Sequence, residues 1–396
     1  MPTPEVIVVG AGPAGATAAI TAARRGAAVT LIDRARFPRD KTCGDGLTAL
    51  ALTELDRLGM SPDHLDSWVP VSEVVLRSPS GRNVDLDLSP TGHRRVPTGV
   101  VRRAELDQAL VRLASAEGVR VLTGGAVTGV SPGSDEITVT LEGGGRLSAD
   151  HLVAADGMWS PTRRHLGLDT PGYRGEWHAA RAYLPVDTDA ARRMWVWFEP
   201  DLLPGYAWSF PLGGGHVNFG FGVLRREGLR GSEFAATWRD LLSRPHVAEV
   251  LGGPHPETTM RAWPIPARVT RAPLTGPRTL FVGDAAAVAD PMTGEGIGQA
   301  METGRLAAEA IAGWSLLGPT AVARSYRRSV RRSLLADHRL AAGLSRLMTS
   351  TTVTRAALAV VDTNDWTRRN FARWMFEDYP RAVLATPRRW SALVPH

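Results

Sequence analysis

The chain has 396 residues, of which 43% are hydrophobic and 22% are charged. This composition is typical of a globular protein with one large core or two joined cores, and we expect neither a transmembrane helix nor a signal peptide. The formal net charge of +6 comes from scattered arginines, since Lys41 is the only lysine, so we expect no nucleic-acid binding. The single cysteine, Cys43, excludes an intrachain disulfide. We therefore expect a cytoplasmic protein, with no metal site.

A glycine-rich turn follows the first predicted strand, residues 5–9, and opens an alanine-rich helix. Gly10 allows the tight turn, Gly12 lets the backbone approach a pyrophosphate, and Gly15 lets the helix pack close to the strand. The helix N-terminus offers free N–H groups and a partial positive charge to phosphates. The second predicted strand ends on Asp33, where an acid can bind ribose hydroxyls. This order of elements predicts a dinucleotide site.

The loop at residues 37–47 combines the only lysine, Lys41, with the only cysteine, Cys43. Two glycines flank Asp45 directly after the cysteine, and such a segment suits a loop that approaches a flat ligand closely. Lys41 either meets a need for a compact, titratable cation or stands there by chance. Cys43 is either a reactive group or a small buried hydrophobe.

Hydrophobic periodicity predicts the elements that follow. We expect helices at residues 48–58 and 101–117, a hairpin at 72–88, strands at 119–123 and 151–155, and a β-meander from 126–130, 136–142 and 146–147. The strand at 151–155 leads into Asp156 and Gly157, with a hydroxyl and an arginine shortly after. This order indicates a second ligand-facing turn.

Aromatic residues become frequent between residues 176 and 266. Four alternating runs predict strands of one antiparallel sheet, at 179–185, 194–198, 205–211 and 217–223. Tyr206, Trp208 and Phe210 alternate along the third run, so all three side chains face the same side. They form an aromatic core face, the apolar wall of a substrate cavity, or both.

After residue 266 the chain returns to the pattern of its start. A predicted strand at 279–282 leads into Gly283 and Asp284, and the glycine-containing segment 290–298 opens a helix that we expect to end near residue 312. The N-terminal amides of this helix can hold a phosphate chain. The tail, residues 319–396, is expected to be helical and rich in arginine, with Trp366, Trp374 and Trp390 among the basic residues. It either packs against the body or lies on a membrane face.

Three motifs together resemble FAD-dependent oxidoreductases of the p-hydroxybenzoate hydroxylase type. They are the glycine turn, the Asp156–Gly157 turn and the Gly283–Asp284 segment, in matching order along roughly the first 310 residues. Within that group the chain most resembles the geranylgeranyl reductase family. Residues 41–47 resemble its Cys-Gly-x-Gly loop, and residues 204–211 resemble its Tyr-x-Trp-x-Phe-Pro motif.

The resemblance implies an α/β fold in which a Rossmann-type FAD-binding domain carries an antiparallel-sheet substrate domain and a helical C-terminal region. We expect the FAD-binding domain at residues 1–175, with a hairpin insertion near 72–94, and again at 269–316; the substrate domain at 176–268; and the helical region at 317–396. The dipole of the helix after residue 296 would face the flavin N1–C2=O edge and stabilise the anionic reduced flavin.

The resemblance also implies noncovalent FAD and reduction of isolated carbon–carbon double bonds, with NADPH or another electron donor as the reductant. Residues expected to bind FAD are Gly10, Gly12, Pro13, Ala14, Gly15, Asp33, Arg34, Cys43, Gly44, Arg103, Val127, Asp156, Gly157, Gly283, Asp284, Pro291, Gly294, Gly296 and Ile297. We expect Cys43, Tyr206 and Trp208 to be catalytic, with Cys43 or Tyr206 as the proton donor, and Tyr206, Trp208 and Phe210 to contact a hydrophobic substrate.

Two other functions remain open from the sequence. One is a flavin monooxygenase that hydroxylates or epoxidises a hydrophobic or aromatic metabolite through a C4a-hydroperoxide, since the fold serves both chemistries. The other is a flavin-binding electron carrier without a substrate of its own. A flavin-dependent halogenase is disfavoured, because the only lysine lies in the cysteine loop and residues 206–211 depart from the halogenase Trp-x-Trp-x-Ile-Pro motif.

Overall fold

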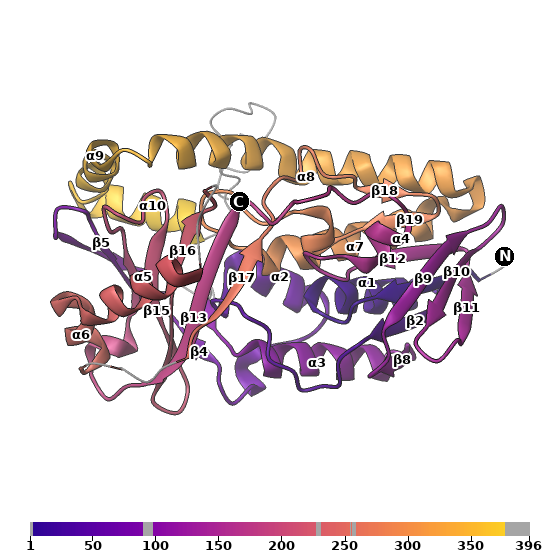
Figure 1. The fold of residues 1–396 in the computed structure, drawn as a ribbon, viewed down its shortest axis with the longest axis horizontal. Helices are drawn as coiled ribbons and strands as arrows, with labels where there is room; N and C mark the ends of the chain where they lie inside the picture. The colour runs from indigo at the N-terminus through magenta and orange to yellow at the C-terminus, as the bar shows by residue number, and fades with distance from the viewer. Residues whose placement is uncertain (1–2, 90–97, 227–230, 254, 256–258, 377–396) are drawn as a thin grey trace.

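The computed structural model describes residues 3–89, 98–226, 231–253, 255 and 259–376 (Figure 1). Its first sheet has the strand order β18-β19-β12-β1-β2-β8. The strands are β1 (Glu5–Val9), β2 (Ala28–Asp33), β8 (Arg120–Thr123), β12 (His151–Ala154), β18 (Thr275–Gly276) and β19 (Thr279–Phe281). All neighbours pair in parallel except β18 with β19. The predicted first and last parts of the FAD-binding region therefore meet in one sheet.

Helices packed on this sheet bring its glycine turn against the later part of the chain. They are α1 (Pro13–Arg24), α2 (Ala49–Arg57), α3 (Arg103–Ala116) and α7 (Ile297–Trp314). A Cβ at Gly304 of α7 would lie 2.1 Å from the Ala14 carbonyl oxygen, so α7 and α1 meet backbone to backbone. The predicted meander forms a separate three-stranded sheet from β9 (Val127–Pro132), β10 (Ile137–Leu141) and β11 (Arg146–Ala149).

A seven-stranded sheet forms the other half of the body, in the order β17-β13-β16-β15-β14-β5-β6. Its strands are β13 (Trp177–Pro185), β14 (Met194–Trp197), β15 (Tyr206–Leu212), β16 (His216–Leu224), β17 (Arg261–Ile265), β5 (Glu73–Arg77) and β6 (Asn83–Asp87). The four predicted strands pair antiparallel, as expected. The sheet is mixed, however, because the hairpin of β5 and β6 joins it through a parallel pairing of β5 with β14.

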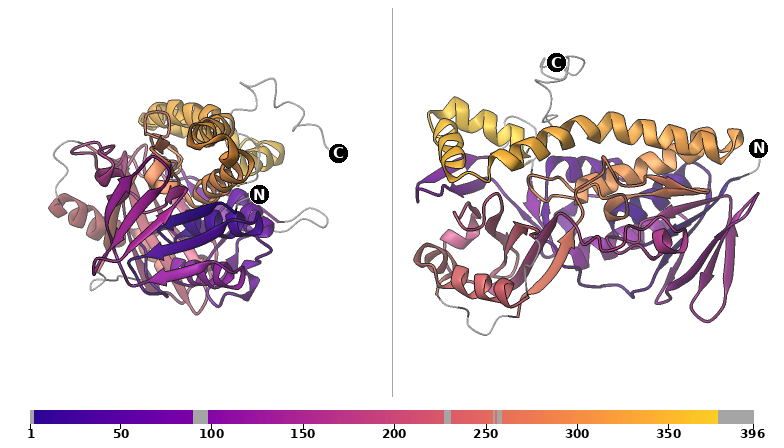
Figure 2. Two further views of the ribbon diagram at one scale, coloured as in Figure 1. Left: turned by 90° about the vertical axis from the view of Figure 1, so that its right-hand side faces the viewer. Right: turned by 45° about the horizontal axis from the view of Figure 1, so that its top comes forward.

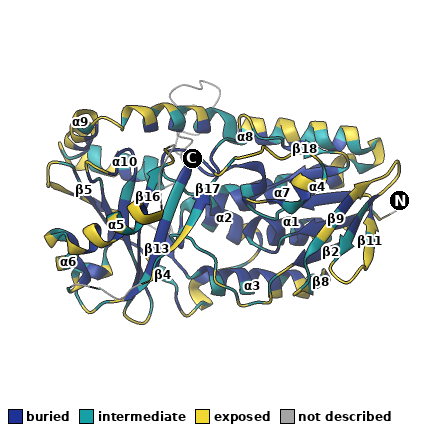
Figure 3. Ribbon diagram, viewed as in Figure 1, coloured by how far each residue is buried: buried dark blue, intermediate teal, exposed yellow. Residues whose placement is uncertain are grey.

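Two helices absent from the sequence prediction cover one face of this sheet: α5 (Gly231–Ser243) and α6 (Pro245–Leu251). Phe234, Trp238 and Leu241 of α5 pack with Phe219 and Phe221 of β16 in one buried cluster. Figure 3 shows the dark blue of buried residues running through the middle of the body, with yellow on outer helix faces, loops and the start of β17. The remaining short elements are β3 (Gly46–Leu47), β4 (Val69–Pro70), β7 (Gly99–Val100), α4 (Pro161–His165) and the 3-10 turns η1 (Pro62–His64), η2 (Ala190–Arg192), η3 (Gly283–Ala286) and η4 (Ser315–Leu317).

The C-terminal helices lie along the body, as Figures 1 and 2 show. They are α8 (Pro319–Leu347), α9 (Thr351–Val361) and α10 (Asp365–Phe376). The buried Tyr326 hydroxyl of α8 donates to the Phe281 carbonyl at 2.6 Å, and Leu358 of α9 and Ala372 of α10 join the cluster that β5 and β6 bury. The tail is thus packed on the body as far as residue 376; Trp390 lies outside the described residues. Within those residues, the apolar runs in the helices fall short of what crossing a membrane requires.

Candidate active site

One cavity of about 1160 Å³ runs from the glycine turn after β1 to the C-terminal helices. Its walls come from the loop at 39–46, from β15 and β17, from the start of α7, and from α8, α9 and α10. Among the predicted site residues, all but Gly15 and Pro291 line this cavity. The Pro291 carbonyl instead accepts a hydrogen bond from the Trp177 indole at 3.1 Å.

Close packing explains two of the three glycines in the turn. A Cβ at Gly10 would lie 2.2 Å from the Ala155 carbonyl oxygen, and Gly10 has a φ of +100°, which favours glycine. A Cβ at Gly15 would lie 1.8 Å from the Gly10 carbonyl oxygen, so Gly15 lets α1 approach the turn, and it does not line the cavity. These contacts agree with the roles expected of the first and third glycines of the motif.

Gly12 differs from both, because open space and two cations face it. The nearest atoms to a Cβ there would be guanidinium nitrogens of Arg39 and Arg103, at 3.5 and 3.7 Å. Gly12 is also the N-cap of α1, and no side chain caps the helix. Uncapped amides, a helix dipole and two guanidiniums together fit a pyrophosphate. The buried Asp107 carboxylate holds both arginines, at 2.8 Å from Arg103 Nε and 3.2 Å from Arg39.

The predicted acids Asp33 and Asp156 line the cavity while shaping the backbone around it. Asp33 accepts hydrogen bonds from the amides of Ala11 and Ala35, both at 2.8 Å. Asp156 accepts from the Ser160 hydroxyl at 2.6 Å and from the Thr162 amide at 2.8 Å, at the start of α4. A carboxylate has about four acceptor sites, so each acid can hold the turn and still accept from a ligand hydroxyl.

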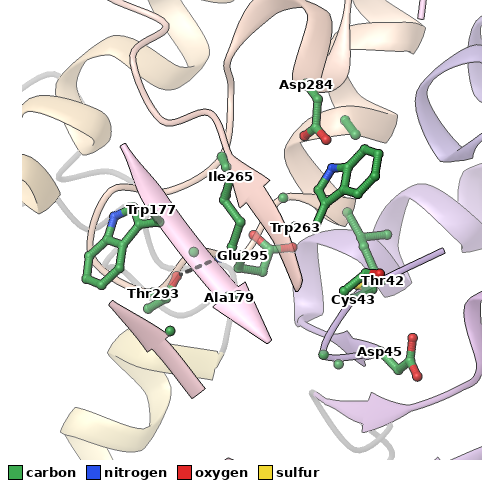
Figure 4. A pocket seen from close by; sticks show the side chains of 18 of the residues that line it. Thr42, Cys43, Asp45, Trp177, Ala179, Trp263, Ile265, Asp284, Thr293 and Glu295 are labelled. Carbon is green, nitrogen blue, oxygen red and sulfur yellow. Dashed lines mark hydrogen bonds between the residues drawn. The ribbon is translucent and has the colours of Figure 1, made fainter. Parts of the chain in front are cut away.

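The cysteine loop places two titratable groups, Lys41 and Cys43, at the cavity wall, and Figure 4 shows Cys43 there. Burial raises the pKa of the Cys43 thiol despite the nearby Arg103, which hydrogen-bonds to it. Burial lowers the pKa of Lys41 to about 8, against the opposing effect of Asp284. The Lys41 ammonium lies 4.2 Å from the centre of the Trp263 ring, a cation–π contact. At neutral pH, Cys43 is therefore a protonated thiol, and the Arg103 guanidinium beside it stays positively charged.

Asp45 ties this loop to the seven-stranded sheet. Its carboxylate is fully buried and accepts from the Tyr183 hydroxyl at 2.7 Å and from the Asn218 amide at 2.9 Å. Asn218 also donates to the Cys43 carbonyl at 2.8 Å and accepts from the Trp208 indole at 3.1 Å. Burial raises the pKa of Asp45 to about 6. The position of Cys43 is thus linked by hydrogen bonds to the predicted substrate wall.

Tyr206, Trp208 and Phe210 line the cavity, and Tyr206 and Phe210 also pack against the buried cluster of β5 and β6, while contact with a substrate stays a prediction. The ring centres of Tyr206 and Trp208 lie 5.9 Å apart, and those of Trp208 and Phe210 lie 6.0 Å apart. A Cβ at Gly44 would lie 3.5 Å from Phe210 and 3.7 Å from Trp208, so the cysteine loop rests on this wall. The Tyr206 hydroxyl donates to the Thr293 carbonyl.

The start of α7 closes the cavity from the other side. Gly296 is its N-cap and lines the cavity, as do Gly283 and Asp284. Figure 4 shows Asp284, Trp263 and Cys43 on three separate segments around the same space. One amide of the first turn is already satisfied, because Gly298 donates to the Glu295 carboxylate at 2.9 Å. The N-terminus of α7 therefore faces the cavity with one of its amides already paired, and its effect on a flavin stays a prediction.

Sequence reasoning missed three parts of the site: Arg39 beside Gly12, the Asp45–Asn218 link, and the cavity end built by α8, α9 and α10. Arg39 had a signal, since it lies in the unusual loop, two residues before Lys41. Asn218 also had one, as a polar residue inside an apolar alternating run. The amphipathic helices of the tail gave no indication of which cavity they would line.

Comparison with known proteins agrees with this geometry. Residues 3–317 match the family model described as an FAD binding domain. The chain is 36% identical over 361 residues to the menaquinone reductase of Mycolicibacterium smegmatis, covering 83% of each chain, and 33% identical over 317 residues to digeranylgeranylglycerophospholipid reductase 1 of Methanopyrus kandleri, covering 77% of this chain and 79% of that protein.

A solved structure shares the whole fold. The geranylgeranyl bacteriochlorophyll reductase-like protein from Thermoplasma acidophilum superposes with a TM-score of 0.77 at 22% identity and covers 99% of both chains. The cradle around Gly12 fits the pyrophosphate of FAD, with Arg39 and Arg103 as its cations. The chain therefore belongs to the geranylgeranyl reductase family of FAD-dependent oxidoreductases, within the p-hydroxybenzoate hydroxylase-like group.

Proposed function

We propose that the protein reduces carbon–carbon double bonds in a long apolar substrate, a prenyl-type chain or a hydrophobic secondary metabolite. The continuity of the cavity carries this proposal, because one space reaches from Gly12 past Cys43 to the apolar side chains of α9 and α10. A chain lying in the apolar half would present an alkene beside the cysteine loop. The names of the two relatives, reductases of a quinone and of a geranylgeranyl lipid, support the same reaction class.

Alkene reduction adds a hydride to one carbon and a proton to the other. FAD, once reduced, supplies the hydride. An unactivated alkene accepts hydride poorly, so the proton donor must lie close and water must be excluded. Met194, Val196, Trp208 and Phe210 line the cavity beside the cysteine loop and make this region apolar.

Cys43 is the better of the two predicted proton donors. The Tyr206 hydroxyl already donates to the Thr293 carbonyl, whereas the high pKa of Cys43 keeps its thiol protonated. When the thiol gives its proton to the substrate carbon, the thiolate left behind faces the Arg103 guanidinium, which stabilises the negative charge. A proton from solvent then restores the thiol.

For the electron donor, NADPH is the first candidate. Lys41, Arg164 and Arg261 line the cavity near Trp159 and Trp263, whose rings meet edge to face at 6.5 Å. Cations and aromatic rings together suit a phosphorylated nicotinamide dinucleotide. Anaerobic mixing of the FAD-loaded protein with NADPH or NADH, followed by flavin absorbance, tests this choice; no bleaching with either would point to a protein donor.

Product mass tests the reaction itself. FAD-loaded, chemically reduced protein is incubated with a polyprenyl substrate, once without oxygen and once with oxygen and NADPH. We expect a gain of two hydrogens per reduced bond without oxygen; a gain of oxygen, in air only, would instead establish a monooxygenase. Cys43→Ala should lower alkene reduction by about a hundredfold or more while flavin reduction is unchanged. Full activity in Cys43→Ala with a large loss in Tyr206→Phe would assign the proton to Tyr206.

A further inference from the structure

An apolar helix face lies uncovered at the outer end of the cavity. On α9 the exposed residues are mostly apolar, with Val353 40% and Val360 65% exposed. Trp366 of α10 and Leu347 at the end of α8 are 72% and 59% exposed. A helix that is apolar on its outer face as well as its inner one is normally covered by something.

The same surface contains the mouth of the cavity. Leu347 and Val353 both line the cavity and are exposed on the outside of the molecule, so the cavity wall and the surface meet at these two side chains. Behind them, Leu344, Leu358 and Phe371 continue the apolar lining inward. A long apolar chain that enters through this mouth avoids contact with water only if the medium outside the mouth is also apolar.

Charge identifies what covers this face. Helix α8 carries seven arginines and a single acid, Asp337, along its 29 residues. Arg346, Arg355 and Arg369 are exposed on the three helices that surround the mouth. Apolar side chains beside exposed arginines are the composition that binds the interface of an anionic bilayer. A second copy of this chain would bring its own arginines against these and meet charge repulsion.

We propose that Leu347, Val353, Val360 and Trp366, which we call the mouth surface, dock on an anionic membrane, so that the cavity takes its apolar chain directly from the bilayer. The identity of the apolar substrate in this inference rests on the proposed function, whereas the membrane-binding surface does not depend on it. The polar head of such a substrate would stay at the lipid surface, beside the arginines, while the chain enters between α8 and α9.

Vesicle binding tests the surface without any turnover. Sedimentation of the FAD-loaded protein is measured with vesicles of phosphatidylcholine alone and with added phosphatidylglycerol. The test variant is Val360→Ser with Trp366→Ser, because neither side chain lines the cavity. The matched control is Leu316→Ser with Leu317→Ser, which are 64% and 69% exposed just before the other end of α8. Flavin content and melting temperature confirm that both variants fold.

We expect the wild type to bind anionic vesicles, weakening with salt, and the mouth variant to bind at least about tenfold more weakly while the control is unchanged. Equal effects of the two variants, or no vesicle binding by the wild type, would overturn the proposal. A wild-type dimer that dissociates in the mouth variant would assign the surface to a second copy. If the protein binds vesicles through this surface but reduces no alkene, the result contradicts the proposed reaction and still supports the proposed membrane-binding surface.

Discussion

Replacing Asp45 with asparagine should remove a pH dependence of stability that the buried carboxylate creates. The asparagine oxygen can still accept from Tyr183 and Asn218, and the residue tolerates the φ of +64° at this position. Burial raises the pKa of Asp45 from 3.8 to about 6 in the folded chain, and the hydrogen bonds from Tyr183 and Asn218 partly oppose it, as do the nearby arginines to a smaller extent. The folded state therefore keeps a proton that the unfolded chain releases at lower pH.

The magnitude follows from the two pKa values. The folded protein should lose about 3 kcal/mol of unfolding free energy as pH rises from below 3.8 to above 6, because each unit of pKa is worth about 1.36 kcal/mol. Roughly half of this loss, about 1.4 kcal/mol, falls between pH 5 and pH 8. Above pH 6 the ionised carboxylate is a cost that Asp45→Asn does not carry.

Urea unfolding of both proteins at pH 5, 6, 7 and 8, with FAD in constant excess, measures this difference. Titrations common to the two proteins cancel, so the difference in unfolding free energy isolates Asp45. We expect Asp45→Asn to gain on the wild type as pH rises, with most of the change complete by about pH 7. A difference that stays constant across this range would refute a raised pKa for Asp45 and the burial argument behind it.

Three further predictions concern the cavity. Gly12→Ala should raise the dissociation constant for FAD by about tenfold or more, measured by flavin fluorescence, because the new methyl enters the space expected for the pyrophosphate. Gly220→Ala should destabilise the protein by about 1–3 kcal/mol in thermal melts, since a Cβ there would lie 2.3 Å from Trp208. The control Gly145→Ala, which has open space around it, should change stability by less than about 0.5 kcal/mol. Because the pKa of Lys41 is about 8, affinity for an anionic electron donor should fall as pH rises through 8, and Lys41→Arg should abolish that fall; an identical pH profile in both proteins would contradict it.

Local patterns predicted the parts of this protein that depend on neighbours in sequence. The glycine turn and its flanking strands are where the motif places them, and α1 begins only three residues earlier than expected because Pro13 is favourable at a helix start. The sequence also predicted the hairpin at 72–88. It did not predict that this hairpin pairs with β14, because alternation shows which face of a strand is buried but not which strand lies beside it.

Contacts between distant residues could not be predicted in the same way. The link between Asp45 and Asn218 joins residues 173 positions apart, and only the packing of the loop on β16 brings them together. Helices α5 and α6 were missed although Phe234, Trp238 and Leu241 have helical spacing, because the aromatic strands before them dominated the interpretation of the region. The far end of the cavity depends on how the tail folds back over the sheet, which no local pattern shows.

Helix α8 would give the proposed substrate path a fixed depth. Its Tyr326 hydroxyl donates to the Phe281 carbonyl of β19, its His338 ring lies 3.1 Å from the Ala267 carbonyl oxygen just after β17, and the helix ends at Leu347 beside the mouth. A continuous helix of this length is stiff over about 40 Å. A headgroup held outside the mouth would thus bring one chosen double bond, counted from that headgroup, to Cys43. The enzyme would then reduce a double bond at a fixed distance from the headgroup, whatever the total length of the substrate chain.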